Sequence, residues 1–315
     1  MIHDVDQLLR TISTSVDDHI KDMEPALKGT INFVYKLTGE KQNYYMKHRK
    51  DFCKNFPGIK IDPQDLAHEV NVLHVMHDAY PQNFPYVVFF DNSENFCVMT
   101  DVVQSGFDLA DGFNNKKLLS EDFYALGKTV GALHFTLKNE HRCDRTNDLE
   151  IYNLNLDYKF GKNAHSAHII DALNAEPKQM ILGDLSPKNI GYNNSQFVFY
   201  DLEYSHQGNA LYEAGFLISH IMLHYSDDEE LANHVDAFKN GYTSSNAEID
   251  VHSALLNKVV LGTMLYRIDN PLSQYSLNWE ENKKNTTIHN IHCMITQKDI
   301  NSNDVLSCIR YNSPV

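Results

Sequence analysis

The chain has 315 residues, which is enough for two domains or for one large two-lobed unit with a buried core. Hydrophobic residues make up 42% of it, a share that excludes an intrinsically disordered chain. Its formal net charge is −15 at pH 7. This charge argues against a general affinity for nucleic-acid backbone or anionic membrane, because both need a basic face. We therefore expect no nucleic-acid partner and no membrane partner.

The five cysteines are scattered along the chain and form no Cys-x-x-Cys pair, which is typical of free thiols in a reducing compartment. The first residues carry acids from Asp4 onward and have no apolar signal core. No apolar run reaches the roughly eighteen residues that span a bilayer. The sequence therefore predicts a cytoplasmic protein and leaves the oligomeric state open.

The N-terminal third alternates between helical and strand-like patterns. Apolar residues at helical spacing predict helices, and runs of β-formers around turn residues predict hairpins. In chain order we predict a helix, two strands, a helix and two strands: 4–22, 31–37 and 43–48, 63–79, 86–90 and 95–103.

The remainder is predicted to be mostly helical, with two short strands near its middle. The predicted helices are 120–138, 211–225, 227–240, 247–266 and 278–297, and the short strands are 179–182 and 196–200. Glycines and turn formers over 103–115 mark the boundary between the two parts. We predict an N-terminal lobe over 1–103, a hinge near 99–104, and a helical C-terminal lobe over 104–315.

Two carboxylates and an amide stand at a distinctive spacing in ILGDLSPKNI and FVFYDLEY. Asp184 precedes Asn189 by five positions, and Asp201 follows at the end of a predicted strand. In kinases, Asp-x-x-x-x-Asn supplies a base and a metal ligand from one loop, and a later Asp supplies the second ligand. A turn with an unrelated strand-end acid is the structural alternative. The added strand and second acid favour the phosphotransfer interpretation.

The N-terminal third offers the other parts of a nucleotide site. Lys47 lies on a predicted strand, and Glu69 on the following helix can pair with it. The turn 28–32 is a candidate phosphate cover, in which Gly29 permits close approach and the backbone from Thr30 to Asn32 supplies donors.

The segment from Met99 to Asp101 occupies the hinge, where its backbone can bond adenine. Each of these nucleotide-site assignments also has an ordinary structural interpretation: an exposed lysine, a helix-face acid, a plain turn or a buried strand.

Seven segments carry a family resemblance: LKGTINFVYKL (27–37), YYMKHR (44–49), HEVNVL (68–73), LGKTVGALH (126–134), ILGDLSPKNI (181–190), VFYDLEY (198–204) and LYEAGFLIS (211–219). In order and spacing they resemble the aminoglycoside phosphotransferase and choline kinase-like superfamily of small-molecule kinases. The methylthioribose kinase branch shares part of this layout. The resemblance covers roughly residues 25–225 and implies an α+β, two-lobed protein-kinase-like fold. Such a fold has a small antiparallel sheet with one main helix in the N-lobe and a larger, mostly helical C-lobe.

The resemblance also implies roles for single residues. Asp184 would be the catalytic base, and Lys47, held by Glu69, would contact the nucleotide phosphates. The metal ligands would be Asn189 and Asp201, with Glu203 supporting the metal shell. The implied cofactors are ATP and Mg²⁺, and the implied partner is a small molecule with an acceptor hydroxyl, such as an aminoglycoside, an amino alcohol or a sugar.

The sequence departs from the family at one point of the loop, because Leu182 stands where the family has a histidine. We expect activity to be kept and one scaffold hydrogen bond to be missing.

Two other functions stay open. A catalytically idle kinase-fold protein could bind nucleotide or a regulatory partner, but such proteins usually lose the lysine, the base or the metal acid, and all are present here. A protein kinase is disfavoured because LYEAGF follows Asp201 almost at once, leaving no long activation loop.

Overall fold

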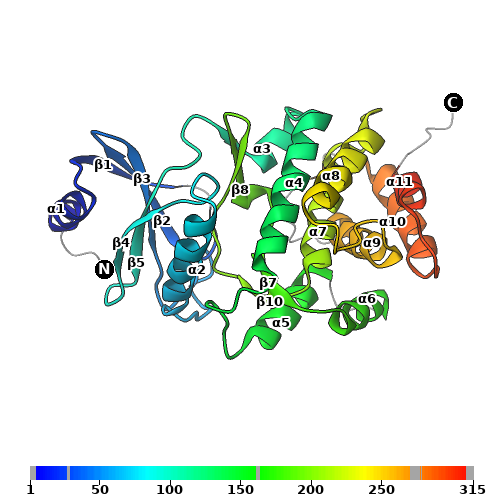
Figure 1. The fold of residues 1–315 in the computed structure, drawn as a ribbon, viewed down its shortest axis with the longest axis horizontal. Helices are drawn as coiled ribbons and strands as arrows, with labels where there is room; N and C mark the ends of the chain where they lie inside the picture. Colours follow the sequence, from blue (N-terminus) through cyan, green and yellow to red (C-terminus); the bar gives the residue numbers. More distant parts are fainter. Residues whose placement is uncertain (1–4, 27–28, 161–163, 270–276, 278, 310–315) are drawn as a thin grey trace. The chain divides into compact units, whose positions relative to one another are not determined.

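A computed structural model describes residues 5–26, 29–160, 164–269, 277 and 279–309. By their internal contacts, the residues form two compact units (Figure 1). The first unit comprises Met1–Phe107 and Ile190–Tyr204, and the second comprises Asp108–Asn189 and Ser205–Val315. The sequence-based lobe boundary at 103–104 stays a prediction.

The first unit is built on a five-stranded antiparallel sheet with the strand order β1-β2-β3-β5-β4. Its strands are β1 (Ile20–Pro25), β2 (Phe33–Gly39), β3 (Asn43–His48), β4 (Val87–Asp91) and β5 (Phe96–Thr100). The two predicted hairpins are β2–β3 and β4–β5. In both, β-branched and aromatic residues suit a pleated, half-buried surface.

Two helices of this unit, α1 (Val5–Val16) and α2 (Asp65–Ala79), cover opposite faces of the sheet (Figure 1). Because side chains alternate along a strand, neighbours on β3 point to different helices. Met46 joins Ile12 of α1 in one apolar core, whereas Lys47 points to α2. This alternation places the predicted lysine beside the predicted glutamate helix.

The predicted helix over 4–22 is too long, and a strand was missed. Helix α1 ends at Val16, because Asp17 takes a left-handed φ of 50° and β1 begins at Ile20. The Asp18 carboxylate accepts backbone N–H bonds from the β2–β3 turn, at 3.0 Å from Glu40 and 3.1 Å from Lys41. A pairing across more than twenty residues has no local signal in the sequence.

A second small sheet in this region, with the order β6-β8-β9, holds the segment that leads to Asp201. Its strands are β6 (Phe107–Asp108), β8 (Ile190–Asn193) and β9 (Gln196–Phe199). The β8–β9 turn places Asn194 and Ser195 at positive φ, as a two-residue hairpin requires. Asn83 bonds the β9 backbone twice, each time at 2.7 Å. Its side-chain Nδ2 donates to the Phe197 carbonyl, and its backbone carbonyl accepts from the Phe199 amide.

The second unit is mainly helical. Its helices are α3 (Leu109–Asn114), α4 (Ser120–Leu137), α5 (Asp148–Phe160), α6 (Ala164–Ala175), η1 (Pro187–Asn189, 3₁₀), α7 (Ala210–His224), α8 (Leu231–Ser245), α9 (Ala254–Asp269), α10 (Glu281–Ile295) and α11 (Ser302–Ile309). Strands β7 (Gln179–Ile181) and β10 (His206–Gly208) pair antiparallel within it. Helix α7 is buried over nearly its whole length and forms the centre of this unit. The small antiparallel sheet and the helical C-terminal region confirm the predicted fold class.

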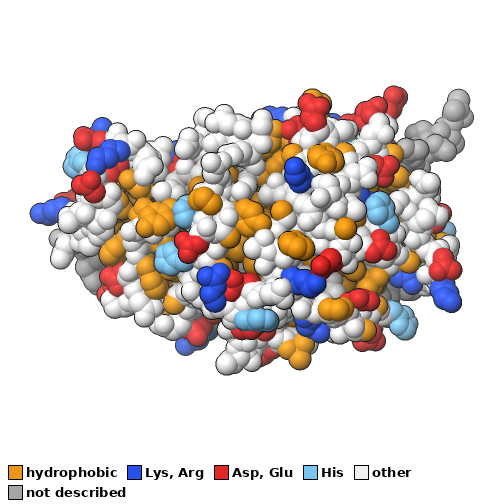
Figure 2. Space-filling view, in the orientation of Figure 1, with side chains coloured by type: hydrophobic (Ala, Val, Ile, Leu, Met, Phe, Trp, Pro, Cys, Tyr) orange, Lys and Arg blue, Asp and Glu red, His pale blue; other side chains and the backbone are white. Residues whose placement is uncertain are grey.

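Among the described residues, none of the helices combines the length and the apolar character needed to cross a bilayer. Acidic and basic side chains are dispersed over the face of the protein drawn in Figure 2. On that face, apolar side chains lie between them rather than in a separate zone.

Candidate active site

Lys47 is the centre of a buried charge cluster in the first unit. Its ammonium lies 2.9 and 2.7 Å from the two carboxylate oxygens of Glu69 on α2. It lies 2.5 Å from Asp201 Oδ1, just beyond β9. The lysine and Glu69 side chains are 6% and 1% exposed, whereas Asp201 is 34% exposed. The cluster therefore opens to solvent on the Asp201 side.

Asp201 reaches the lysine through an unusual backbone conformation. Its φ of 64° lies in the left-handed region, which non-glycine residues rarely adopt and which recurs at functional sites. The next residue, Leu202, donates its N–H to Glu69 Oε1 at 3.2 Å. The chain thus turns sharply after β9, and the same glutamate holds both the lysine and this turn.

The charges of the cluster shift the pKa values of its members. Burial alone would lower the pKa of Lys47, but the carboxylates of Asp201 and Glu69 outweigh it and raise that pKa well above its usual value. Burial raises the pKa of Glu69 to about 7 against the opposing effect of Lys47. Because its own pKa is raised, the Lys47 side chain stays protonated and positively charged.

Glu203 belongs to the same cluster through different partners. Its Oε2 accepts from Arg49 Nη1 at 2.5 Å and from Asn32 Nδ2 at 2.6 Å, and it lies 3.8 Å from Lys47 Nζ. Oxygens of Glu69, Asp201 and Glu203 all lie within 4.8 Å of one another. Among the described residues this is one set of hard oxygen donors close enough to share a cation.

The predicted phosphate turn precedes β2, and its first residue, Lys28, lies outside the described residues. Gly29 has a φ of 114°, a conformation that only glycine adopts without strain. The Thr30 carbonyl accepts from the Asn55 amide at 3.0 Å and from Cys53 Sγ at 3.2 Å. A neighbouring loop therefore holds the turn by its carbonyl side.

The hinge segment uses several of its backbone groups inside the first unit. The Thr100 amide donates to Tyr86 and the Asp101 amide to Asn43, at 3.0 and 3.1 Å. The Asp101 carboxylate caps the following turn. Met99 is buried in β5. The amides of Thr100 and Asp101 are therefore already paired within the first unit.

In the second unit, Asp184 and Asn189 lie on one short loop between β7 and β8. Gly183, at φ 83°, turns the chain, and the 3₁₀ helix η1 ends on Asn189. Asn189 Nδ2 donates to the Asp184 backbone carbonyl at 3.1 Å and to its Oδ2 at 3.0 Å. The Asn189 side-chain amide thereby orients the Asp184 carboxylate through its nitrogen, and its Oδ1 takes no part in this contact.

The loop is anchored by Glu213, in the first turn of α7. Its two carboxylate oxygens accept the N–H groups of Leu182 and Gly183, at 3.0 and 2.6 Å. His134 of α4 lies 3.1 Å from the same carboxylate through Nε2, and 2.7 Å from the Tyr242 hydroxyl through Nδ1. Because an ionised carboxylate only accepts, Nε2 carries a proton.

Leu182 is itself buried, at the position where the resemblance implies a histidine. Its carbonyl accepts from Ser205 Oγ at 3.2 Å. The loop therefore keeps its hydrogen-bonded scaffold through backbone groups.

Asn155 of α5 supports the same loop from another side. Its Nδ2 donates to the Gly183 carbonyl at 2.6 Å, and its Oδ1 accepts from the Tyr212 hydroxyl at 3.2 Å. Burial raises the pKa of Tyr212 well above its usual value, and the nearby Asp184 charge adds to this. The phenol therefore stays protonated and donates to Asn155.

The structure brings Lys47, Glu69, Asp201 and Glu203 together in one unit, and Asp184 with Asn189 in the other. Sequence reasoning missed four supporting residues: Arg49, His134, Asn155 and Glu213. Three of them stand in the segments YYMKHR, LGKTVGALH and LYEAGFLIS, so a signal existed for Arg49, His134 and Glu213 but not for Asn155.

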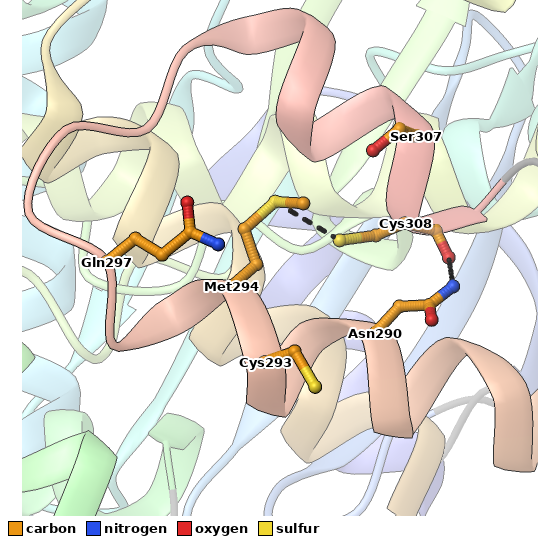
Figure 3. Close-up of a pocket in the computed structure, with 6 residues that line it drawn as sticks. All are labelled: Asn290, Cys293, Met294, Gln297, Ser307 and Cys308. Carbon is orange, nitrogen blue, oxygen red and sulfur yellow. Dashed lines mark hydrogen bonds between the residues drawn. The ribbon is translucent and has the colours of Figure 1, made fainter.

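A pocket of about 260 Å³ lies between α10 and α11 (Figure 3). Met294 and Cys308 point toward each other there, with their sulfur atoms 3.4 Å apart, while the Cys293 side chain is directed away from this pair. The lining holds no charged side chain and none of the predicted site residues. We do not assign it to the active site.

The fold is shared with solved structures of small-molecule kinases. Three of them are an amicoumacin kinase in complex with AMP-PNP and Ca²⁺, the choline kinase LicA from Streptococcus pneumoniae, and a putative fructosamine-3-kinase from Thermobifida fusca. Their TM-scores are 0.59, 0.52 and 0.53, and their sequence identities are 14%, 14% and 11%. The matches cover 93%, 96% and 98% of this chain, and 93%, 95% and 100% of those chains. No protein-family model and no curated protein matches the sequence.

Proposed function

We propose that the protein transfers the γ-phosphoryl group of ATP to a hydroxyl group of a small molecule. The observation that carries this proposal is the Lys47 ammonium, bound between Glu69 of α2 and Asp201 beyond β9. A lysine–glutamate pair beside a metal-binding aspartate is the arrangement that kinases use to position nucleotide phosphates. The shared fold of the amicoumacin and choline kinases supports the same function.

The first unit would bind the nucleotide. Lys47 is permanently charged and would donate to phosphate oxygens while Glu69 holds its side chain in place. The oxygen donors of Asp201 and Glu203 fit a hard divalent cation such as Mg²⁺. The resemblance implies Asn189 as a further ligand. When bound, such a cation neutralises charge on the phosphates.

Asp184 would be the base. Its carboxylate, oriented by Asn189, would accept the proton of the acceptor hydroxyl as the acceptor oxygen bonds the γ-phosphorus. The bond from the γ-phosphorus to the β–γ bridging oxygen would break in the same step, and ADP would leave. Glu213 and Asn155 would keep the loop backbone still, because both bond its peptide groups directly. The chain's contribution at this step is therefore positioning and proton transfer.

The acceptor class is proposed by analogy with the shared fold. The named kinases act on amicoumacin, choline and, by the name given to the third, fructosamine. We propose an acceptor of this kind, namely an amino alcohol, an aminoglycoside or a sugar. An ADP-release screen of the purified protein across these classes tests the proposal. Nucleotide binding without acceptor-stimulated ADP release from any class would favour the idle kinase-fold alternative.

Replacing the base tests the chemical step. We expect Asp184→Asn to lower turnover by about 10²–10⁴-fold, because a general base contributes on that order. MgATP binding, measured by titration calorimetry, should stay near the wild-type value. Wild-type turnover in this variant would overturn the assignment of Asp184.

Replacing the acid beyond β9 tests the nucleotide site. We expect Asp201→Ala to abolish Mg²⁺-dependent ATP binding, because it removes the most exposed oxygen donor of the cluster. The matched control is Asp22→Ala, which removes an exposed acid from β1 of the same unit. Equal ATP affinities for the two variants would contradict the assignment of Asp201.

A further inference from the structure

Arg49 lies on the continuation of β3, two residues beyond Lys47, and is 6% exposed. Its guanidinium donates to four acceptors from three segments of the first unit. Nη1 bonds Glu203 Oε2 at 2.5 Å and Asn32 Oδ1 at 3.3 Å, Nη2 bonds Asp65 Oδ2 at 3.0 Å, and Nε bonds the Asp62 carbonyl at 2.8 Å. Arginine suits this place because its rigid fork serves several acceptors at once.

The two acceptors of Nη1 belong to the two segments that would meet the nucleotide. Asn32 closes the predicted phosphate turn, and Glu203 lies two residues beyond Asp201. These two side chains also bond each other, from Asn32 Nδ2 to Glu203 Oε2 at 2.6 Å. One buried three-residue network therefore joins the turn before β2 to the segment after β9.

Arg49 also divides the carboxylates of the cluster between two cations. Lys47 Nζ is 2.5 Å from Asp201 but 3.8 Å from Glu203, whose Oε2 is taken by Arg49. A buried carboxylate must be compensated by a partner. Without the guanidinium, the nearest cation for Glu203 would be Lys47, and the lysine would be drawn away from Asp201.

We propose that Arg49 is a positioning residue of the nucleotide–metal site, acting through Glu203 and Asn32. It keeps Lys47 on Glu69 and Asp201, and it fixes the phosphate turn and the metal-binding segment in one mutual arrangement. The inference rests on the proposed function, since it assigns Arg49 a part in binding a divalent cation and nucleotide. Hydrogen-bonding partners of metal ligands typically change metal affinity by about 10–100-fold when removed.

The test measures AMP-PNP binding to the full chain by titration calorimetry at a series of Mg²⁺ concentrations, so it does not depend on knowing the acceptor. We expect Arg49→Met and Arg49→Lys to raise the Mg²⁺ concentration for half-maximal binding by about 10–100-fold. Binding should recover at saturating Mg²⁺.

The matched control is Lys21→Met, which removes a basic partner from an exposed ion pair with Glu40 in the same unit. It should leave the Mg²⁺ requirement unchanged. Thermal unfolding of every variant separates positioning from structure, because a purely structural role lowers the unfolding temperature without moving the Mg²⁺ requirement of the folded protein. That result would overturn the inference.

If Arg49→Met does not fold, Arg49→Lys and Glu203→Gln carry the test, and wild-type Mg²⁺ dependence in both would overturn the inference. Failure of the wild-type protein to bind AMP-PNP with Mg²⁺ would instead overturn the proposed function, and the inference with it. A wild-type protein that binds normally beside unchanged variants would overturn the inference alone.

Discussion

At the scale of single residues, Glu213 shows how one buried acid keeps a loop in place. The carboxylate is 1% exposed and binds two successive backbone N–H groups, at Leu182 and Gly183. Hydrogen bonds to a charged group are stronger than those between neutral groups, at about 1.5–3 kcal/mol each. One acid thus holds the loop directly by its backbone.

We therefore expect Glu213→Gln to lower the free energy of unfolding by about 2–4 kcal/mol, since the amide nitrogen would face a backbone donor. Denaturant titration measures this. The control is Glu248→Gln, in an ion pair with Lys138 whose side chains are about half exposed, where we expect a loss of at most about 1 kcal/mol. Equal losses in the two variants would show that Glu213 does not anchor the loop.

At the scale of elements, α4 and α8 approach each other closely through glycines. A Cβ added to Gly127 would lie 2.0 Å from the Phe238 carbonyl oxygen, and one added to Gly241 would lie 2.0 Å from the Tyr124 carbonyl oxygen. Each glycine thus faces the backbone of the other helix. This contact brings Tyr242 of α8 to His134 of α4, and so to the loop anchor.

Two effects compete when such a glycine is replaced. Helix propensity favours alanine by about 1 kcal/mol, whereas overpacking a tight contact costs about 1–3 kcal/mol or more. A backbone oxygen at 2.0 Å cannot move without displacing its helix, so we expect Gly127→Ala to be destabilising overall. The control is Gly58→Ala, where nothing lies within 4 Å of the added carbon. Comparing their unfolding midpoints checks this, and a stabilised Gly127→Ala would contradict the packing argument.

Elements also differ in how well the sequence predicts them. The strands β2 and β3 follow from runs of β-formers around turn residues, and the helix α2 follows from its apolar spacing and from Pro63 near its start. β1 was missed because half of its six residues, IKDMEP, are charged and because it is an edge strand paired with β2. An edge strand of this kind is decided by the neighbour that it joins rather than by its own pattern.

At the scale of the whole molecule, the buried histidine His224 makes the free energy of unfolding depend on pH. Burial, followed by the charge of Arg267, lowers the pKa of His224 from 6.5 to about 4. The C-terminal position of this residue on α7 would favour the charged form by up to about 2 kcal/mol, so burial is the larger effect. Between about pH 6.5 and pH 4, the folded protein therefore keeps His224 neutral, whereas the unfolded chain protonates it.

It follows that the free energy of unfolding should fall as the pH is lowered from about 6.5 to about 4, by about 3 kcal/mol for this residue. In His224→Phe, we expect the free energy of unfolding to fall by about 3 kcal/mol less than in the wild type between pH 7 and pH 4. Denaturant titration across this pH range measures the difference. The raised pKa of Glu69 acts in the opposite direction and is present in both proteins, so it cancels in the difference. Parallel profiles for the two proteins would contradict the buried neutral state.

The sequence by itself determined the order and spacing of the chemical groups. Lys47 before Glu69, and Asp184, Asn189 and Asp201 at kinase spacing, follow from short patterns that each lie on one strand, helix or loop. Periodicity and turn chemistry act over a few residues, so such patterns are readable without the fold.

Only the tertiary structure decided which buried groups satisfy one another. Arg49 meets Glu203 across 154 positions, and Glu213 meets Leu182 across 31. No local rule selects these partners. A buried charge requires compensation, and which side chain supplies it depends on which segments are removed from water together when the chain folds.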